Sequence, residues 1–243
     1  MKVGTDSLIL GSWALATNQA QHSNEQQINV LDIGCGTGLL TLMLAQKLMP
    51  ETGNVVADRV YQLCQFTAVE IDTGACFDAE LNFANSRWAD NIQLIKSPIQ
   101  ALADGIKYQR IICNPPYFGA GQVIDKNREL ARLQSRLDWQ TLAQQISQRL
   151  AVNGIAELVF PFVDLAYVKA IFAEHNLTCI AELHVFPKVT DEVAKRVCIR
   201  VKLASGCCDE FLAPEAEKLV IYNDANKYTE QYRALCRAYY LNF

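Results

Sequence analysis

The sequence lacks the cysteine and histidine patterns of a disulfide-stapled or zinc-binding protein. Nine cysteines form an odd number with no CxxC pair, and the three histidines form neither HxxH nor HxxxH. A secreted disulfide framework favours even, spaced cysteines, so these residues are predicted to be reduced thiols in a cytoplasmic protein. Because paired ligands are scarce, no metal site is predicted.

Long apolar runs and an excess of basic charge are also missing. No run approaches the roughly 20 residues of a membrane span, so no membrane association is predicted. The net charge of −4 and a pI near 5.4 argue against binding nucleic acid by bulk charge, so any RNA contact has to come from local clusters. The first 16 residues loosely resemble a signal peptide, but Asp6 cancels Lys2 and residues 11–13 interrupt the apolar stretch, so no cleaved leader is expected.

Short apolar strands alternate with helices over most of the length. The expected strands cover residues 28–33, 67–71, 92–95, 110–113 and 155–160, and the expected helices cover residues 39–48, 75–88, 141–150 and 166–175. Because parallel strands need helical crossovers, this alternation predicts an α/β fold with a doubly wound, mostly parallel sheet.

The rhythm changes toward the end of the chain. Residues 178–184 and 196–203 are two expected strands with no helix between them, which predicts an antiparallel pair near the end of the sheet. A further strand over 218–222 and a terminal helix over 229–241 follow. The connection over 50–66 is unusually long and predicts an extra helical turn or a mobile loop. No linker rich in Pro, Gly or Ser divides the chain, so residues 1–243 are predicted to form a single domain.

A glycine-rich turn follows the first expected strand at residues 32–38. Gly34, Gly36 and Gly38 remove side chains from a tight turn at a place where ligands bind in open α/β sheets. The dinucleotide fingerprint G-x-G-x-x-G fails at Leu39, and no Gly-Lys-Ser/Thr completes a P-loop. D-x-G-x-G-x-G, beginning here at Asp32, instead resembles class I S-adenosylmethionine-dependent methyltransferases. That resemblance implies a loop against the methionyl part of the cofactor; a glycine turn that only serves packing is the alternative.

A carboxylate, Glu70, lies at the expected end of the second strand. In that position it can accept hydrogen bonds from both hydroxyls of a ribose, as the equivalent acidic residue does in dinucleotide folds. A solvated loop carboxylate is the alternative.

Residues 114–117 read Asn-Pro-Pro-Tyr directly after the fourth expected strand. Pro115 and Pro116 cannot continue a ladder or a helix, so they predict a rigid extended turn at the carboxyl edge of the sheet. The amide oxygen of Asn114 and the carbonyl of Pro115 can each accept one hydrogen of a planar NH2 group, which directs the nitrogen lone pair toward a methyl donor. Tyr117 offers a stacking face. The attacking amine is neutral, so positioning rather than a general base accounts for most of the rate.

This motif indicates the reaction but leaves the substrate open. Enzymes with the Asn-Pro-Pro-Tyr motif methylate the exocyclic amine of adenine in DNA or RNA, or the side-chain amide of glutamine in release factors. A catalytically silent scaffold that binds cofactor and RNA is a further alternative, against which the intact Asn114 and Tyr117 count.

The two motifs occur together with a distinctive beginning and end. The opening Lys-Val-Gly-Thr-Asp at residues 2–6 and the aromatic tail over residues 218–241 complete a set that resembles the bacterial tRNA adenine-N6 methyltransferases. Those enzymes act on valine tRNA at the adenosine just 3′ of the anticodon. The resemblance spans essentially the whole chain and implies S-adenosyl-L-methionine as cofactor and tRNA as partner. No obligate protein partner is inferred. The resemblance also implies a C-terminal strand–helix extension and an N-terminal segment, including Gly4, Thr5 and Asp6, that closes over the cofactor.

One position departs from that family. Its members tend to carry an aspartate after the third strand to hold the cofactor adenine, whereas this chain has Ser97 followed by Pro98. Pro98 offers no side-chain hydrogen bond, so Ser97, or alternatively Gln100, is expected to substitute.

Two basic stretches are candidates for RNA contact. Arg128, Arg132 and Arg136 recur every four residues, so a helix would place them on one face near the reaction centre. A solvated helix face is the alternative. A second stretch, in which solubility is the stronger interpretation, contains Lys188, Lys195, Arg196, Arg200 and Lys202.

Overall fold

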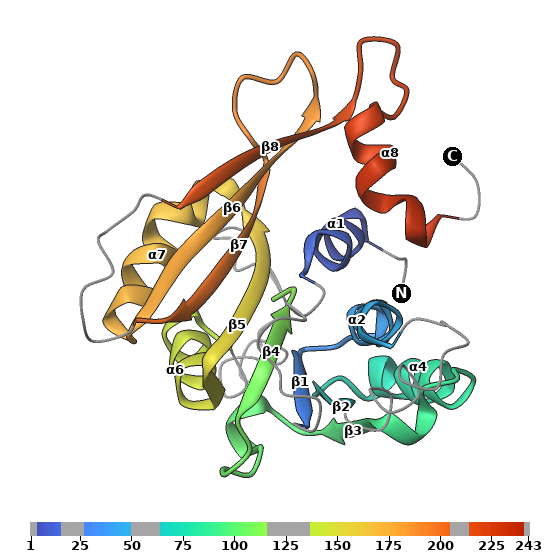
Figure 1. The fold of residues 1–243 in the computed structure, drawn as a ribbon, viewed down its shortest axis with the longest axis vertical. Helices are drawn as coiled ribbons and strands as arrows, with labels where there is room; N and C mark the ends of the chain where they lie inside the picture. The colour runs from blue at the N-terminus through green and yellow to red at the C-terminus, as the bar shows by residue number, and fades with distance from the viewer. Residues whose placement is uncertain (1–3, 16–26, 50–63, 116–136, 205–213, 241–243) are drawn as a thin grey trace, which may run out of the picture.

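The computed structural model describes residues 4–15, 27–49, 64–115, 137–204 and 214–240. Eight strands of these residues form one sheet in the order β3-β2-β1-β4-β5-β7-β6-β8 (Figure 1). The strands are β1 (Ile28–Ile33), β2 (Cys64–Glu70), β3 (Ile92–Lys96), β4 (Tyr108–Cys113), β5 (Leu150–Pro161), β6 (Leu177–Lys188), β7 (Arg196–Leu203) and β8 (Glu215–Tyr222).

The sheet is mostly parallel, as the sequence predicts. The pairs β1–β2, β1–β4, β2–β3, β4–β5 and β6–β8 are parallel. Strand β7 lies between β5 and β6 and is antiparallel to both. The expected antiparallel pair is therefore confirmed. The position of β7 follows from its short connection to β6, which returns the chain directly alongside the strand it has just left.

Helices cover both faces of the sheet (Figure 1). They are α1 (Thr5–Trp13), α2 (Leu39–Leu48), α4 (Thr73–Ala84), α6 (Trp139–Arg149), α7 (Leu165–Glu174) and α8 (Glu230–Cys236). One apolar core joins α1, α2 and α8 to the sheet, and a smaller cluster adds α4 through Phe83. A separate core packs α6 and α7 on the opposite face. Adjacent residues of β4 alternate between the two cores, with Ile112 in one and Ile111 in the other, as a sheet covered on both faces requires.

Three helices differ clearly from the sequence prediction. The helix expected over 75–88 ends at Ala84, because Asn85 donates its side-chain amide to the Leu81 carbonyl and Ser86 bonds the Phe83 carbonyl. Helix α1 was not expected at all. The terminal helix also ends early, at Cys236, and continues as a 3-10 turn over Arg237–Tyr239. The connection expected over 50–66 lies, up to residue 63, outside the described residues.

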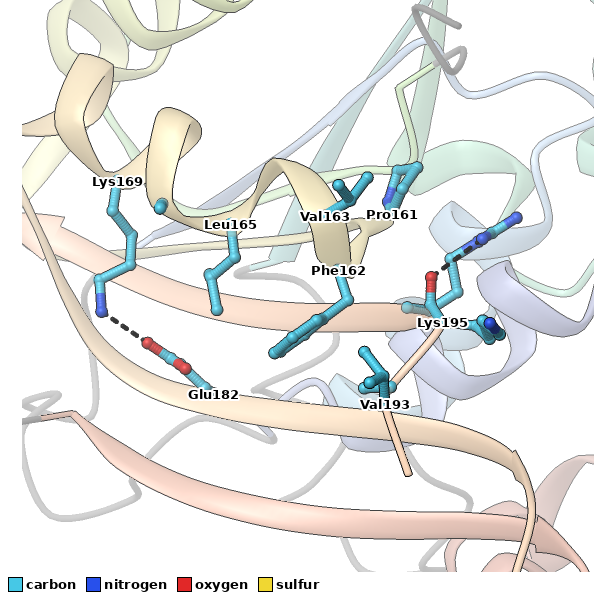
Figure 2. Close-up of a pocket in the computed structure, with 11 residues that line it drawn as sticks. Pro161, Phe162, Val163, Leu165, Lys169, Glu182, Val193 and Lys195 are labelled. Carbon is cyan, nitrogen blue, oxygen red and sulfur yellow. Dashed lines mark hydrogen bonds and ion pairs between the residues drawn. The ribbon is translucent and has the colours of Figure 1, made fainter. Parts of the chain in front are cut away.

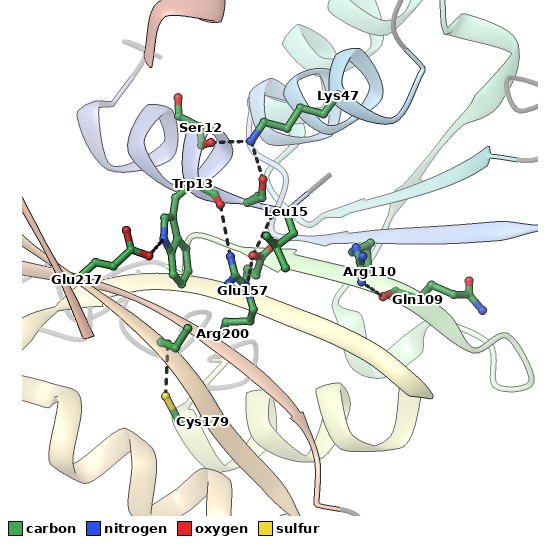
Figure 3. A network of polar contacts seen from close by, with 12 residues as sticks. Ser12, Trp13, Leu15, Lys47, Gln109, Arg110, Glu157, Cys179, Arg200 and Glu217 are labelled. Atoms are coloured by element: carbon green, nitrogen blue, oxygen red, sulfur yellow. Dashed lines mark hydrogen bonds and ion pairs between the residues drawn. The ribbon is translucent and has the colours of Figure 1, made fainter. Parts of the chain in front are cut away.

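Helix α1 is anchored to the sheet and to α2 by a cluster of cations (Figure 3). The Arg200 guanidinium lies 4.2 Å from the centre of the Trp13 ring and donates to Glu157 at 2.8 Å. Lys47 of α2 donates at 2.6 Å to each of the carbonyls of Ser12 and Ala14, which are left unpaired where α1 ends. Burial lowers the pKa of Lys47 to about 8.

The described part of the chain can be compared with three expectations, on cysteines, metals and membrane-spanning helices. Its seven cysteines are all free, which agrees with the prediction of reduced thiols. Within the same residues, histidine, cysteine and acidic side chains form no group of three or more that could hold a metal ion. None of the helices that the structure describes is long and apolar enough to cross a membrane.

Candidate active site

The residues singled out by both sequence motifs lie at one edge of the sheet. Strands β1, β2 and β4 are parallel neighbours, so the glycine turn after β1, Glu70 at the end of β2 and Asn114 after β4 lie on the same side. From β1 the chain crosses to β2 on one side of β1, whereas β4 pairs with β1 on the other side. Ligands of open α/β sheets bind at such a switch point.

The glycine turn presents bare backbone. Gly34, Gly36 and Gly38 have positive φ angles of 70°, 56° and 83°, a region that favours glycine. The turn is fixed to β2 because the amides of Gly34 and Cys35 both donate to the Val69 carbonyl, at 2.9 and 3.0 Å. A Cβ atom at Gly34 or Gly36 would meet nothing within 4 Å, so this side of the turn is open to a ligand.

Gly38 has a different reason to be glycine. It is buried at the start of α2, and a Cβ atom there would lie 2.3 Å from the Phe83 ring of α4. Its missing side chain lets α4 pack closely against the turn.

The Glu70 carboxylate is held by three backbone amides. Its Oε2 accepts from Gly36 at 2.8 Å, and its Oε1 accepts from Ile71 at 2.8 Å and Asp72 at 2.9 Å. A carboxylate has about four lone-pair sites, so one acceptor position remains in this arrangement. Accepting from two ribose hydroxyls, as the sequence predicts, requires exchange of one of these amides.

Asp32 is buried beneath the glycine turn. Thr41 of α2 donates its hydroxyl to Asp32 Oδ2 at 2.6 Å, whereas Oδ1 is buried without a hydrogen-bond partner among the described residues. Burial is the main cause that raises the pKa of this carboxyl to about 7, and the nearby Glu70 charge adds to it. The unpaired oxygen can accept from a donor that enters the site.

Asn114 is oriented by a residue far away in the sequence. Its amide nitrogen donates to Ser7 Oγ of α1 at 2.8 Å, so the amide oxygen is left to accept from another group. Pro115 follows and is buried. Pro116 and Tyr117 lie outside the described residues.

The segment expected to cover the cofactor is the start of α1. Gly4 occupies the position before its first turn, and Thr5 and Asp6 begin the helix. Asp6 accepts from Arg196 Nε of β7 at 3.0 Å, which joins this end of α1 to the far half of the sheet. Sequence reasoning missed Ser7 and the Asp6–Arg196 pair. No local pattern signals either, because the partners lie 107 and 190 residues apart.

The remaining candidates are less connected to this group. Ser97 follows β3, partly buried, and its hydroxyl donates to the Pro98 carbonyl at 3.2 Å. Arg128, Arg132 and Arg136 lie outside the described residues. Cys35 and Cys113 flank the site, but burial raises the pKa of both thiols above the ordinary value, so they remain protonated small side chains.

Together these groups fit S-adenosylmethionine. The open backbone at Gly34 and Gly36 can lie against the methionyl part, and Asp32 has a free buried acceptor for an amino group. Glu70 retains an acceptor site near the same turn. When bound, this cofactor supplies an electrophilic methyl group.

Comparisons with known proteins agree with this assignment. The family model described as methyltransferase small domain matches residues 5–132. Proteins named tRNA1(Val) (adenine(37)-N6)-methyltransferase from Shewanella baltica and Haemophilus influenzae are 34% and 36% identical over 248 residues, which covers 100% of this chain and 93% of each relative.

A solved structure shows the fold. A protein from Agrobacterium tumefaciens described as a predicted O-methyltransferase superposes with a TM-score of 0.61 at 14% identity, over 96% of this chain and 95% of that one. Together with the full-length identity to the two relatives, this shows that the chain is a class I, S-adenosylmethionine-dependent methyltransferase of the family named tRNA1(Val) (adenine(37)-N6)-methyltransferase.

Proposed function

We propose that this protein transfers a methyl group from S-adenosyl-L-methionine to the exocyclic N6 amine of the adenosine at position 37 of valine tRNA. The observation that carries the proposal is full-length identity to enzymes named for this reaction, in a chain that places Asn114 beside the glycine turn. The placement matters because a planar amine has to meet the methyl donor at this edge of the sheet.

In the proposed reaction the chain acts mainly by positioning. The Asn114 amide oxygen and the Pro115 carbonyl accept the two hydrogens of the target amine, and the bond from Asn114 to Ser7 fixes which end of the amide faces it. Well-oriented reactants of this kind lower the barrier without a general base. The roles of Pro116 and Tyr117, a rigid turn and a stacking face, remain predictions from sequence.

The cofactor side of the proposal assigns each expected residue a separate task. Gly34, Gly36 and Gly38 shape the turn, and Asp32 and Glu70 accept hydrogen bonds. Gly4, Thr5 and Asp6 cover the site from α1, and Ser97 lies where an adenine contact is expected.

The proposal treats residues 1–243 as one methyltransferase domain, supported by a sheet that runs without interruption from β3 to β8. The partner is tRNA, with Arg128, Arg132 and Arg136 as candidate RNA contacts. A tRNA substrate also favours a cytoplasmic enzyme.

Methyl transfer from labelled cofactor tests the proposal. Total tRNA, duplex DNA and a release factor are offered side by side, and label is expected in tRNA alone, at the N6 position of adenosine 37 in the valine isoacceptor. Label in DNA or in a release-factor glutamine would show that the same chemistry acts on another substrate and would contradict the tRNA assignment. Cofactor and tRNA binding without transfer to any of the three would indicate a silent scaffold.

A further inference from the structure

An open pocket lies one strand away from Asn114, between the end of β5 and the turn that joins β6 to β7 (Figure 2). Its volume is about 850 Å³, within the usual range of ligand sites. Its walls include Pro161, Phe162, Val163, Val193, Lys195 and Arg196. None of the roles proposed for the reaction uses this space.

The pocket is connected to the reaction centre by a short chain of contacts. Arg196 donates to Asp6, and the next residue, Ser7, accepts from Asn114. Strand β5 pairs in parallel with β4, so Pro161 ends at the same edge of the sheet as Asn114 begins its turn. The pocket therefore lies at the edge of the sheet where a substrate would meet Asn114.

The walls are unusually apolar for a surface position. Val163 is 86% exposed and Val193 is 58% exposed, and both line the pocket together with the half-buried Phe162, whose ring lies beside Val193 (Figure 2). That ring contacts His184 edge-on, with centroids 4.8 Å apart and planes inclined by 69°. Exposed apolar groups gathered around an aromatic ring mark a binding surface, and a flat base has the shape to cover them.

The rim is cationic, although the whole chain is acidic. Glu182 is already engaged by Lys169 and His184, each at 2.7 Å, and Arg196 is paired with Asp6. Lys195 is exposed and forms no ion pair with any of the described residues. Among the charged residues that line the pocket, Lys169, Lys195 and Arg196 outnumber Glu182. This balance favours an anionic ligand.

We propose that this pocket binds a nucleotide of the tRNA that neighbours the target adenosine, with its base against Phe162, Val163 and Val193 and its phosphate beside Lys195. The inference rests on the proposed function. An adenosine that reaches Asn114 has to leave the anticodon-arm stack, and its neighbour then loses a stacking partner. An apolar wall beside the reaction centre would replace that contact.

Substitution of the exposed valines tests the pocket without disturbing the core. Val163→Asp and Val193→Asp are each expected to weaken tRNA binding about tenfold, within the range that loss of one stacked base produces. Affinity for S-adenosylhomocysteine should not change. Val152→Asp is the matched control. It adds the same charge, and Val152 is 83% exposed near the opposite end of β5. Val163→Ser, which adds no charge, should also weaken tRNA binding.

A second variant tests the phosphate contact. Lys195→Ala should lower the slope of log affinity against log salt by about one, as loss of one phosphate contact does. The pocket is refuted if both valine variants bind tRNA as Val152→Asp does while the native protein methylates tRNA. Tight tRNA binding by the native protein without methyl transfer would instead refute the proposed function. The tRNA affinities of the valine variants would then still test whether the pocket binds tRNA. Absence of tRNA binding by the native protein would overturn both.

Discussion

Asn114 donates its amide nitrogen to Ser7, which leaves the amide oxygen to act as an acceptor for another group. Asn114→Ala should therefore lower the single-turnover rate by about 100-fold or more, the usual cost of losing a preoriented partner at a reacting group. Ser7→Ala keeps the acceptor but frees its orientation, so a smaller loss is expected. Single-turnover rates at saturating cofactor and tRNA measure both. Cofactor and tRNA affinities should stay near native, and native turnover in Asn114→Ala would place the reaction centre elsewhere.

Glu70, the last residue of β2, accepts hydrogen bonds from the Gly36 amide of the glycine turn and from the amides of Ile71 and Asp72. Glu70→Ala removes this acceptor, so affinity for S-adenosylhomocysteine should fall by about 10-fold or more, as loss of a hydrogen bond to a charged group predicts. Calorimetric titration measures the change. Glu80→Ala is the control, since Glu80 is half exposed and pairs only with the equally exposed Lys96 among the described residues. Equal affinities in the two variants would remove Glu70 from the site.

The buried Asp32 carboxyl makes stability depend on pH. Its pKa is raised from 3.8 to about 7, so the folded protein keeps a proton that the unfolded chain loses above pH 4. The free energy of unfolding therefore falls as pH rises from about 4 to 7 and then levels off. Asp32→Asn removes this pH dependence. Its free energy of unfolding, relative to that of the native protein, should therefore rise by about 2–3 kcal/mol from pH 5 to pH 8. Urea unfolding at both values measures it, and a pH-independent difference would show that Asp32 is ionised in the fold.

At the scale of elements, local patterns predict some parts of the chain to the residue. Strand β1, helix α2 and strand β7 have the expected bounds because each is an apolar run closed by a clear boundary signal. Helix α1 gives no such signal. Its residues from Leu8 to Trp13 are all buried, and Gly11 lies where a Cβ atom would be 2.6 Å from Met43. A helix buried on most sides has no 3.6-residue alternation to detect.

The joint between β1, α2 and α4 depends on Gly38. A side chain there would combine a positive φ of 83° with a contact of 2.3 Å to the Phe83 ring. Gly38→Ala should lower the free energy of unfolding by about 3 kcal/mol, from backbone strain and overpacking together. Gly36→Ala is the matched control, since its φ is also positive but its Cβ would meet open space. It should cost about 1 kcal/mol. Urea unfolding of both distinguishes them, and equal losses would show that Phe83 gives way without cost.

At the scale of the whole molecule, some features of the site follow from the order of the strands, whereas others depend on contacts between segments that are distant in the sequence. The glycine turn, Glu70 and Asn114 lie at strand ends, so topology alone brings them to one edge. The contacts of α1 with Asn114 and Arg196, and the pocket beside β5, join segments that are distant in the chain. Docking of α1 across both halves of the sheet is set by side-chain packing, and periodicity carries no information about it.

Charge at the scale of the whole molecule gives the last prediction. A chain of net charge −4 gains little RNA affinity from its overall field, so binding depends on a few local cations that release counterions from phosphates. Replacing both Arg128 and Arg132 with Ala should weaken tRNA binding and reduce the slope of log affinity against log salt by about one to two. Lys107→Ala is a control, because Lys107 precedes β4 at the edge of the sheet opposite Asn114. Filter binding between 50 and 200 mM salt measures the slopes, with S-adenosylhomocysteine affinity expected to stay native. An unchanged slope in the double variant would mean that these arginines form a solvated face and that the tRNA reaches Asn114 by another path.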